Sequence, residues 1–524
     1  MNDDASMNGS QAGNVLLITA DQWRWDFCSG SGFPQQTTPA IDQLAAQATC
    51  FDRHFANATP CGPSRACLLT GMYAHNHRSV QNGTPLDGSF TNLALEARQA
   101  GYTPELFGYT DTSADPRGRD ASDPALTTYE GVMPGFDPVC LFIENNRPWL
   151  SFLESKGYDV PGPGYAICAP LVADEPSSPT RQPARYRAEH SDTAWLVDQC
   201  ISHLHRLKSE PRDKPFFVHL SLLRPHPPWI APAPYNTMFN AMDMPAVRRP
   251  PDCSEKAAQH PFLDWQLGRI PQQAYFERGE GLASDLDEHQ VAQIRATYAG
   301  LLREVDDNLS RLFSALKELG FYDETLIVVT SDHGEQLGDH FLFGKLGFFD
   351  ESYRIPLIVR DPRQPSGHGK RVEAFTESVD LMPTILSWIG LEAPGQCDGL
   401  ALDPWLDGES PADWRDAVHW SFDFRNPQTR AGERHFDLAG DACNATVRRD
   451  GRWKYVHFAG LPPLLFDLDS DPAEAMDLAG SSGHLVERLE MAEAMLAWRH
   501  RTSYGALSNI MLTDRGPVEA RRYS

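Results

Sequence analysis

A cysteine stands at the start of a short segment whose residue types favour chemistry on an anion. Cys61 is followed by Gly-Pro-Ser-Arg, and the spacing predicts a helix that Pro63 opens and Gly71 closes. Unpaired N–H groups and the positive dipole at this helix start, with Arg65 one turn later, would hold an anion beside the sulfur. The alternative is an ordinary helix start with a structural thiol at Cys61.

Polar residues also follow three apolar runs that predict buried strands of a parallel sheet. The runs are residues 14–19, 215–222 and 325–330, and they lead into Asp21 with Gln22, Arg224 to His226, and Asp332 with His333. Because ligands bind beyond the carboxyl ends of such strands, we expect these residues to meet in one cleft. Two aspartates and one imidazole would form an oxygen and nitrogen site suited to Mn²⁺ or Ca²⁺.

Composition excludes several classes of partner. The chain has 524 residues and a formal net charge of -25, which argues against a nucleic-acid groove or an anionic membrane surface as partner. Its ten cysteines form no C-x-x-C pair, so they indicate reduced thiols rather than a disulfide framework or structural zinc. The first 13 residues lack the pattern of a signal peptide, and no run is apolar enough to span a membrane. We therefore expect a soluble, cytoplasmic protein.

The elements around these residues predict an α/β protein of two unequal parts. One long amphipathic helix is expected over residues 294–316, and two proline-rich segments, 161–183 and 225–251, would pass over the active-site face. After residue 404 the pattern changes to strand-like runs at 417–424 and 445–458, with a turn at Asp450-Gly451, and ends in a helix over 485–499. We predict a catalytic α/β domain over residues 14–404 and an antiparallel subdomain with a terminal helix over 405–524.

The string C-x-P-S-R-x-x-x-L-T-G from Cys61 to Gly71 resembles the signature by which sulfatases have this cysteine oxidised to formylglycine. More closely, the chain resembles the phosphonate monoester hydrolase and related arylsulfatase branch of the alkaline phosphatase superfamily. The matching segments are residues 20–24, 75–78 with Asn82, 108–110, 224–228, 344–347, 349–360 and 465–478. The resemblance implies an alkaline-phosphatase-like, mixed and mostly parallel sheet flanked by helices, with a smaller C-terminal antiparallel sheet.

The same resemblance implies roles for individual residues. The implied metal ligands are Asp21, the modified Cys61, Asp332 and His333. The implied catalytic residues are Cys61, Arg65, His226 and Lys345, with the last two near the leaving oxygen. The implied substrate-binding residues are Gln22, Asn82, Tyr109 and Asp111. Gln22 stands where many sulfatases have a second aspartate.

Two departures from the family pattern bear on specificity. Tyr109 and Asp111 replace the Gly-Lys-x-His motif of many sulfatases, and phosphonate monoester hydrolases are expected to have a neutral threonine near position 111. A carboxylate at Asp111 would disfavour a dianionic phosphate monoester and tolerate a monoanion better. The alternative is a solvated loop aspartate.

The implied activity is hydrolysis of monoanionic sulfate esters, with overlapping phosphonate monoester and phosphodiester hydrolysis. One hydroxyl of a hydrated aldehyde attacks sulfur or phosphorus and displaces the alkoxide or phenoxide. The other hydroxyl then loses its proton and expels sulfate or phosphonate by breaking the carbon–oxygen bond, which regenerates the aldehyde. Implied cofactors are one divalent metal ion and the formylglycine itself. Implied partners are a small-molecule ester, a formylglycine-generating enzyme during maturation and further copies of the chain in a homo-oligomer.

Three alternatives remain open at this point. In the first alternative, the main activity is hydrolysis of phosphonate monoesters or phosphodiesters. In the second, the chain is a non-catalytic homologue that binds an anion in the same pocket. The third is a two-metal phosphatase or phosphodiesterase with a serine or threonine nucleophile, which would need a second set of Asp and His ligands.

Overall fold

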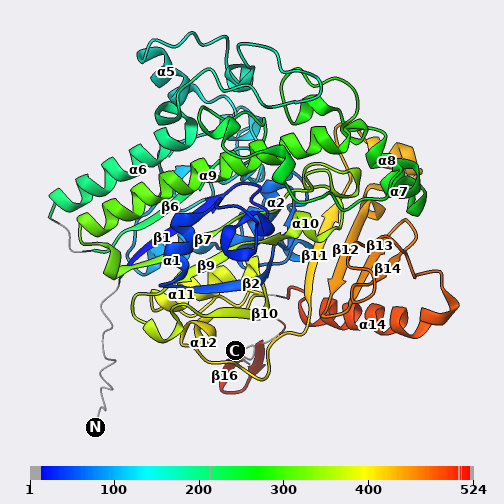
Figure 1. Cartoon of the computed structure of the whole chain (residues 1–524). Coiled ribbons are helices and arrows are strands. Elements are labelled where there is room, and N and C mark those ends of the chain that lie inside the picture. Colours follow the sequence, from blue (N-terminus) through cyan, green and yellow to red (C-terminus); the bar gives the residue numbers. More distant parts are fainter. Residues whose placement is uncertain (1–12, 212–213, 506–507, 509, 520–524) are drawn as a thin grey trace.

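A large mixed sheet forms the centre of the molecule (Figure 1). The computed structural model describes residues 13–211, 214–505, 508 and 510–519. Among these residues, nine strands make up this sheet, eight of them in the order β10-β2-β9-β7-β1-β6-β4-β5, with β8 paired to β2. In that order they are Arg371–Glu377, Thr49–Phe55, Leu357–Arg360, Thr325–Thr330, Asn14–Ala20, Phe217–Leu222, Pro104–Gly108 and Asp137–Leu141, with β8 at Arg354–Ile355.

The pairing of these strands confirms the expected mixed, mostly parallel sheet. β1 pairs in parallel with β6 and β7, whereas β9 runs antiparallel to β7 and β2. Ala20 pairs with Leu222, and Thr19 pairs with Thr330, so the carboxyl ends of the three predicted strands lie side by side. The polar residues that follow them therefore meet at one edge.

Helices cover both faces of the sheet because the central strands are apolar on both sides. Leu16 and Ile18 of β1 pack in one apolar cluster with α1 (Pro39–Ala45), α6 (Asp192–Ser209) and α9 (Glu288–Glu318). Val15 and Leu17 point the other way, toward α2 (Cys61–Thr70), α4 (Leu93–Gln99) and α11 (Leu381–Trp388). This alternation is the two-residue period of a strand buried on both faces. The remaining α-helices are α3 (Ala74–His77), α5 (Arg147–Ser155), α7 (Cys253–Gln259), α8 (Pro261–Leu267), α10 (Asp350–Tyr353), α12 (Asp403–Leu406), α13 (Ala431–Phe436) and α14 (Leu485–Arg501).

A second, smaller sheet lies beside the first and matches the predicted antiparallel subdomain. Its order is β14 (Leu464–Asp467), β13 (Trp453–Phe458), β12 (Asn444–Arg449), β11 (Val418–Asp423) and β3 (Ala58–Thr59). Met491, Met495 and Trp498 of α14 pack in one apolar cluster with residues of this sheet. The short β3 pairs in parallel with β11 and ends just before Cys61, so the helix with the cysteine starts at this second sheet. The division at residue 404 stays a prediction.

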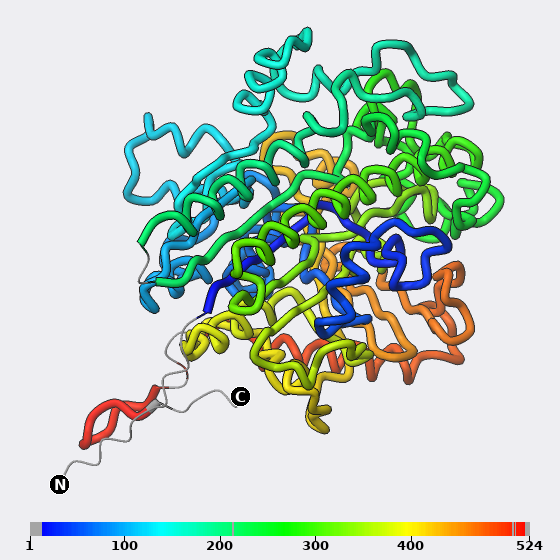
Figure 2. Tube along the Cα trace, turned by 60° about the vertical axis from the view of Figure 1, so that its left-hand side comes forward, coloured from blue at the N-terminus to red at the C-terminus, as the bar shows by residue number. Residues whose placement is uncertain are grey.

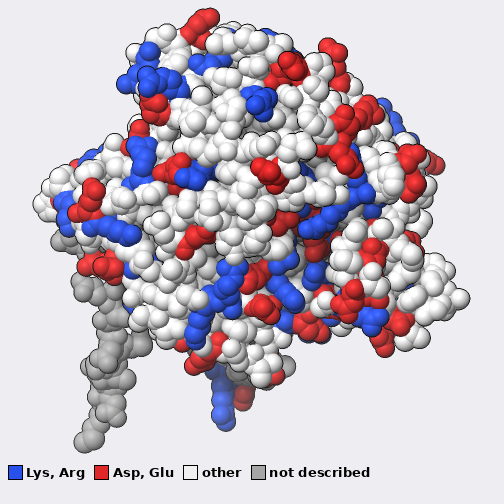
Figure 3. Space-filling view, viewed as in Figure 1, with Lys and Arg blue, Asp and Glu red and all other residues white. Residues whose placement is uncertain are grey.

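Two further views place the outlying parts. The hairpin of β15 (Ile510–Thr513) and β16 (Gly516–Glu519) stands apart from the body of the molecule (Figure 2). On the face shown in Figure 3, the described Lys and Arg side chains lie interspersed with Asp and Glu rather than in one basic patch. Within the described ranges, no helix has the length and apolar character that crossing a membrane requires.

Candidate active site

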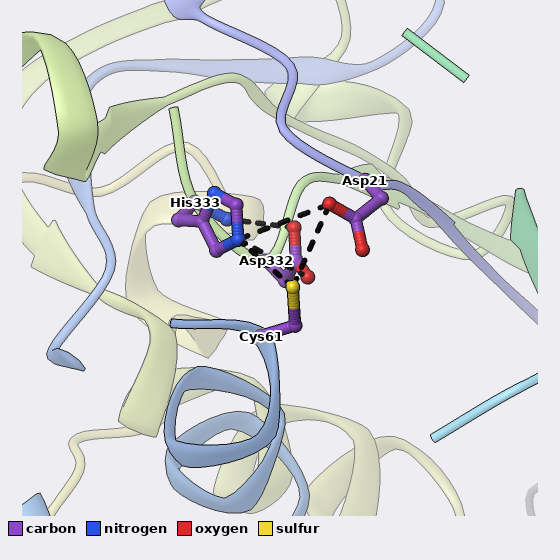
Figure 4. A group of neighbouring side chains, drawn as sticks. All are labelled: Asp21, Cys61, Asp332 and His333. Carbon is purple, nitrogen blue, oxygen red and sulfur yellow. Dashed lines mark hydrogen bonds and ion pairs between the residues drawn. The ribbon is translucent and has the colours of Figure 1, made fainter. Parts of the chain in front are cut away.

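The structure brings the four predicted metal ligands together at the carboxyl edge of the large sheet. Asp21 directly follows β1, Asp332 and His333 follow β7, and Cys61 is the first residue of α2. One ligand atom from each of the four lies within 4.8 Å of the others (Figure 4). The predicted helix is confirmed, because α2 runs from Cys61 to Thr70 and Gly71 ends it with φ 67°. The role of Asp21, Cys61, Asp332 and His333 as metal ligands stays a prediction.

The orientation of the imidazole fits a metal site. Nδ1 of His333 donates to the carbonyl oxygen of Gly334 at 3.0 Å, since a carbonyl can only accept. Nε2 consequently presents its lone pair to the cluster, 3.3 Å from Sγ of Cys61. Histidines that bind metals commonly hold their second nitrogen in this way. Two carboxylates and this nitrogen form a donor set that fits one divalent cation.

The two carboxylates respond differently to burial. Burial opposes ionisation of Asp21, but interactions with His226, Lys345 and other neighbours, Arg65 among them, hold its pKa well below the usual value. Burial and the charge of Asp21 raise the pKa of Asp332 to about 7, against the lowering effect of Arg65. Two buried carboxylates this close favour additional positive charge between them.

Arg65 of α2 supplies part of that positive charge. Its Nε lies 3.1 Å from Oδ2 of Asp332, and its Nη2 lies 3.1 Å from Oδ2 of Asp21. Nη1 donates to Oγ of Ser221 on β6 at 2.7 Å. The guanidinium is buried and absent from the cavity wall, so its observed contacts hold the two carboxylates in place.

Lys345 and Gln22 approach Cys61 from the loops after β7 and β1. Nζ of Lys345 donates to Sγ of Cys61 at 3.1 Å and to Oε1 of Gln22 at 2.9 Å. Gln22 has the unusual φ of 68°, and its side-chain amide also donates to Glu335. Gln22 does not line the cavity, so its observed contact is with Lys345 rather than with the cavity.

The thiol itself lacks the features of an activated cysteine. Burial and the charge of Asp21 raise the pKa of Cys61 well above its usual value, although Lys345 opposes the shift. Catalytic thiolates show the opposite shift. The environment is therefore poorly suited to a nucleophilic thiolate.

Tyr109 and Asp111 follow β4 and reach the same centre. No Cβ fits at Gly108, beside the carbonyl oxygen of Ser221, so β4 and β6 approach closely there. The hydroxyl of Tyr109 donates to Oδ2 of Asp21 at 2.6 Å. Asp111 lies 4.0 Å from Nε of Arg65, and burial raises its pKa to about 7. With 8% of its surface exposed, Asp111 is not a solvated loop residue, and that alternative is wrong.

Asn82 and His226 complete the predicted set. Oδ1 of Asn82 accepts from the backbone N–H of Gly62 at 2.9 Å, at the start of α2. Nδ1 of His226 donates to the carbonyl oxygen of Pro227 at 2.5 Å. Burial and the charge of Lys345 lower the pKa of His226 to about 3, so the imidazole is neutral at neutral pH.

These residues border a cavity of about 100 Å³. Seven of the site residues predicted from the sequence line it, namely Asp21, Cys61, Asn82, Tyr109, Asp111, His226 and Lys345. The lining residues that were not predicted are Tyr129, Glu130, Phe142, Ile143, Glu144, Tyr165 and Leu223. Most of these residues lie in segments without a motif. The sequence signals were the proline-rich segment around Tyr165 and the predicted strand that ends just before Leu223.

The sequence is similar to families of known ester hydrolases. Residues 13–391 match the family model described as sulfatase, and residues 338–500 match that of the N-sulphoglucosamine sulphohydrolase C-terminal region. The chain is 43% identical over 492 residues to the multifunctional alkaline phosphatase superfamily protein PehA of Trinickia caryophylli, covering 93% of this chain and 95% of that protein. It is 26% identical over 503 residues to an arylsulfatase of Clostridium perfringens, covering 92% and 93%.

Solved structures of related hydrolases also superpose on this chain. The phosphonate monoester hydrolase of Agrobacterium radiobacter superposes with a TM-score of 0.93 at 46% identity, covering 97% of this chain and 100% of that chain. The phosphonate monoester hydrolase SpPMH from Silicibacter pomeroyi superposes with a TM-score of 0.90 at 41% identity, covering 98% and 100%. The chain therefore belongs to the sulfatase family of the alkaline phosphatase superfamily.

Proposed function

We propose that this chain hydrolyses monoanionic sulfate esters and phosphonate monoesters, with overlap to phosphodiesters, through a formylglycine made from Cys61. The observation that carries the proposal is the position of Cys61. Its Sγ lies 3.3 Å from Nε2 of His333, 3.9 Å from Oδ1 of Asp21 and 3.1 Å from Nζ of Lys345. An oxygen nucleophile at this point would face both ligand side chains and a cation.

Asp21, Asp332, His333 and the modified residue 61 would hold one divalent cation, Mn²⁺ or Ca²⁺. Such an ion supplies positive charge to the ester oxygens and lowers the pKa of an oxygen nucleophile. The chain's own residues prepare the site. Arg65 fixes both carboxylates, and the Tyr109 hydroxyl holds Asp21 through the oxygen that Arg65 also contacts.

We assign Lys345 and His226 to the leaving oxygen of the ester. Burial lowers the pKa of Lys345, but the interactions with Cys61 and Asp21 outweigh it and raise the pKa above the usual value, so its ammonium stays charged. We assign Lys345 to electrostatic stabilisation of the leaving oxygen rather than to proton release. Asn82 holds the start of α2, so that the N-terminal N–H groups keep their position beside the anionic centre.

Phosphonate monoester hydrolysis as the main activity is the second candidate. Two solved structures at 46% and 41% identity carry that name, whereas the arylsulfatase relative is 26% identical. Both candidates use the same centre and differ in the preferred ester. With either activity, a formylglycine-generating enzyme would convert Cys61 during maturation. From its sequence we also expect the protein to be cytoplasmic and to form a homo-oligomer.

The experiment compares 4-nitrophenyl sulfate, 4-nitrophenyl phenylphosphonate and bis(4-nitrophenyl) phosphate, with and without added Mn²⁺. We expect turnover of the sulfate and the phosphonate to require metal and to be abolished in Cys61→Ala. Cys67→Ala is the matched control, because Cys67 is a buried cysteine of the same helix that contacts His77 instead. Full activity of Cys61→Ala, or no turnover of any ester by the modified enzyme, would contradict the proposal.

A further inference from the structure

The cavity beside Cys61 has an acidic and aromatic lining that the hydrolysis of a simple ester does not use. We call it the acidic–aromatic wall, and its members are Asp111, Tyr129, Glu130, Phe142, Glu144 and Tyr165. Among the described residues that line the cavity, Lys345 is the only Lys or Arg. Lys345 is already engaged by Cys61 and Gln22. Among the described residues, Asp111 has a 4.0 Å ion pair with Arg65, and neither Glu130 nor Glu144 has an ion pair with a Lys or Arg.

Hydrogen bonds hold two of these carboxylates, Glu130 and Glu144, together. The Tyr129 hydroxyl donates to the Glu144 carboxylate, and the backbone N–H of Glu144 donates to Oε1 of Glu130 at 2.5 Å. Burial, and secondarily the nearby charges of Asp21 and Glu130 among others, raise the pKa of Asp111, although Arg65 opposes them. Hydrogen bonds thus join Tyr129, Glu130 and Glu144, and Asp111 is close enough for its pKa to respond to the charge of Glu130.

Asp111 gives independent evidence of an incomplete charge balance. It is more than nine-tenths buried, yet no described residue donates a hydrogen bond to its carboxylate. Among the described residues its one ion pair is the 4.0 Å contact with Arg65, whose guanidinium is closer to Asp21 and Asp332 at 3.1 Å each. A carboxylate that lines a cavity and has no hydrogen bond from a described residue can accept one from a ligand.

We propose that the organic group of the substrate carries an ammonium or quaternary ammonium cation, which the acidic–aromatic wall binds while the anionic ester lies at the ligand cluster. The proposal rests on the proposed function and specifies its substrate class. Such a substrate has no net charge, so neither the acidic wall nor the net charge of -25 repels it.

The rings and the carboxylates act together in this recognition. Aromatic faces attract quaternary ammonium groups, and nearby carboxylates add Coulomb attraction at low dielectric. The rings alone would equally accept a neutral aryl group. The three carboxylates distinguish the two cases, because they contribute attraction only when the organic group is charged.

Two isosteric esters test the proposal directly. They are the 2-(trimethylammonio)ethyl and the 3,3-dimethylbutyl monoesters of methylphosphonate, which have the same shape and differ in one positive charge. We expect kcat/KM for the cationic ester to exceed that of the neutral ester by about tenfold or more. Calorimetry on Cys61→Ala, which does not turn the esters over, should show the same preference as a difference in Kd.

Variants assign the preference to the wall. In the double variant Glu130→Gln with Glu144→Gln, the ratio of kcat/KM between the two esters should fall toward unity. Glu154→Gln, an exposed glutamate of α5 outside the cavity, should leave the ratio unchanged. A ratio near unity in the native enzyme, or a ratio that survives the double variant, overturns the cation proposal. Failure of the native, modified enzyme to hydrolyse any of the three 4-nitrophenyl esters would instead overturn the proposed function, and this proposal with it.

Discussion

The ammonium of Lys345 lies 3.1 Å from Sγ of Cys61, the atom whose position the nucleophile would take. Lys345 also contacts Gln22, so it is held in place from two sides. For Lys345→Met we expect kcat/KM to fall by about 100-fold or more, with the largest losses for esters of poorly acidic phenols. The measurement is a series of aryl esters of graded phenol pKa. Lys370→Met, at an exposed lysine, is the control, and an equal loss across the series would contradict the role at the leaving oxygen.

Tyr109 contacts the Asp21 carboxylate with its hydroxyl at 2.6 Å. Because such supporting hydrogen bonds orient metal ligands, Tyr109→Phe should weaken Mn²⁺ binding by about 10- to 100-fold. Calorimetric titration of the metal measures this effect. Tyr102→Phe removes a hydroxyl that donates to Gly13 instead and should leave the affinity unchanged. Equal Mn²⁺ affinity in Tyr109→Phe and the native protein would show that the hydrogen bond does not support a ligand.

Asp111 should select against dianionic esters. In Asp111→Asn, the ratio of kcat/KM for 4-nitrophenyl phosphate to that for 4-nitrophenyl sulfate should rise by about tenfold at pH 8. Since burial raises the pKa of Asp111 to about 7, the carboxyl is largely protonated well below that pH. The difference between variant and native enzyme should therefore shrink toward pH 6. A ratio that does not change with the substitution at either pH would remove Asp111 from the account of specificity.

Glu304 of α9, which lies outside the active site, should make the free energy of unfolding depend on pH. Burial, with the charge of Asp192, raises its pKa from 4.5 to about 8. The folded state therefore binds a proton that the unfolded state has released, and this group lowers stability as pH rises from about 4.5 to about 8. Glu304→Gln should make the free energy of unfolding less dependent on pH in this window, by up to about 1.4 kcal/mol per pH unit.

Chemical denaturation at pH 6 and pH 8 checks that expectation. Glu318→Gln, an exposed glutamate of the same helix, should retain the native pH dependence. If Glu304→Gln and the native protein lost equal stability between the two pH values, Glu304 would be ionised in the folded state, contrary to the expected shift.

The meeting of Asp21, Asp332 and His333 could be predicted from the strand pattern, whereas the place of Cys61 among the ligands came from the resemblance to sulfatases. Asp21 and Asp332 each follow an apolar strand, and Cys61 starts a helix with clear opening and closing residues. Adjacent parallel strands end at the same edge, so the convergence followed from the strand pattern alone. Helix α9 was equally predictable, because its apolar residues recur at helical spacing.

The rest of the site depends on loops that have no periodic signal. Glu130 and Glu144 reach the cavity from segments whose path is set by tertiary packing. The contact of Gln22 with Lys345 depends on a left-handed backbone conformation that no local pattern indicated. The two-residue β3 was missed for a similar reason, since a strand of that length has no recognisable alternation.

The central claim is that residue 61 acts as formylglycine, and one measurement tests it most directly. Intact-peptide mass spectrometry of the peptide containing Cys61, on fractions of different specific activity, gives the share of aldehyde in each. We predict that activity rises in proportion to the aldehyde and extrapolates to zero for the pure thiol. A fully active fraction in which residue 61 is an unmodified cysteine would contradict the account.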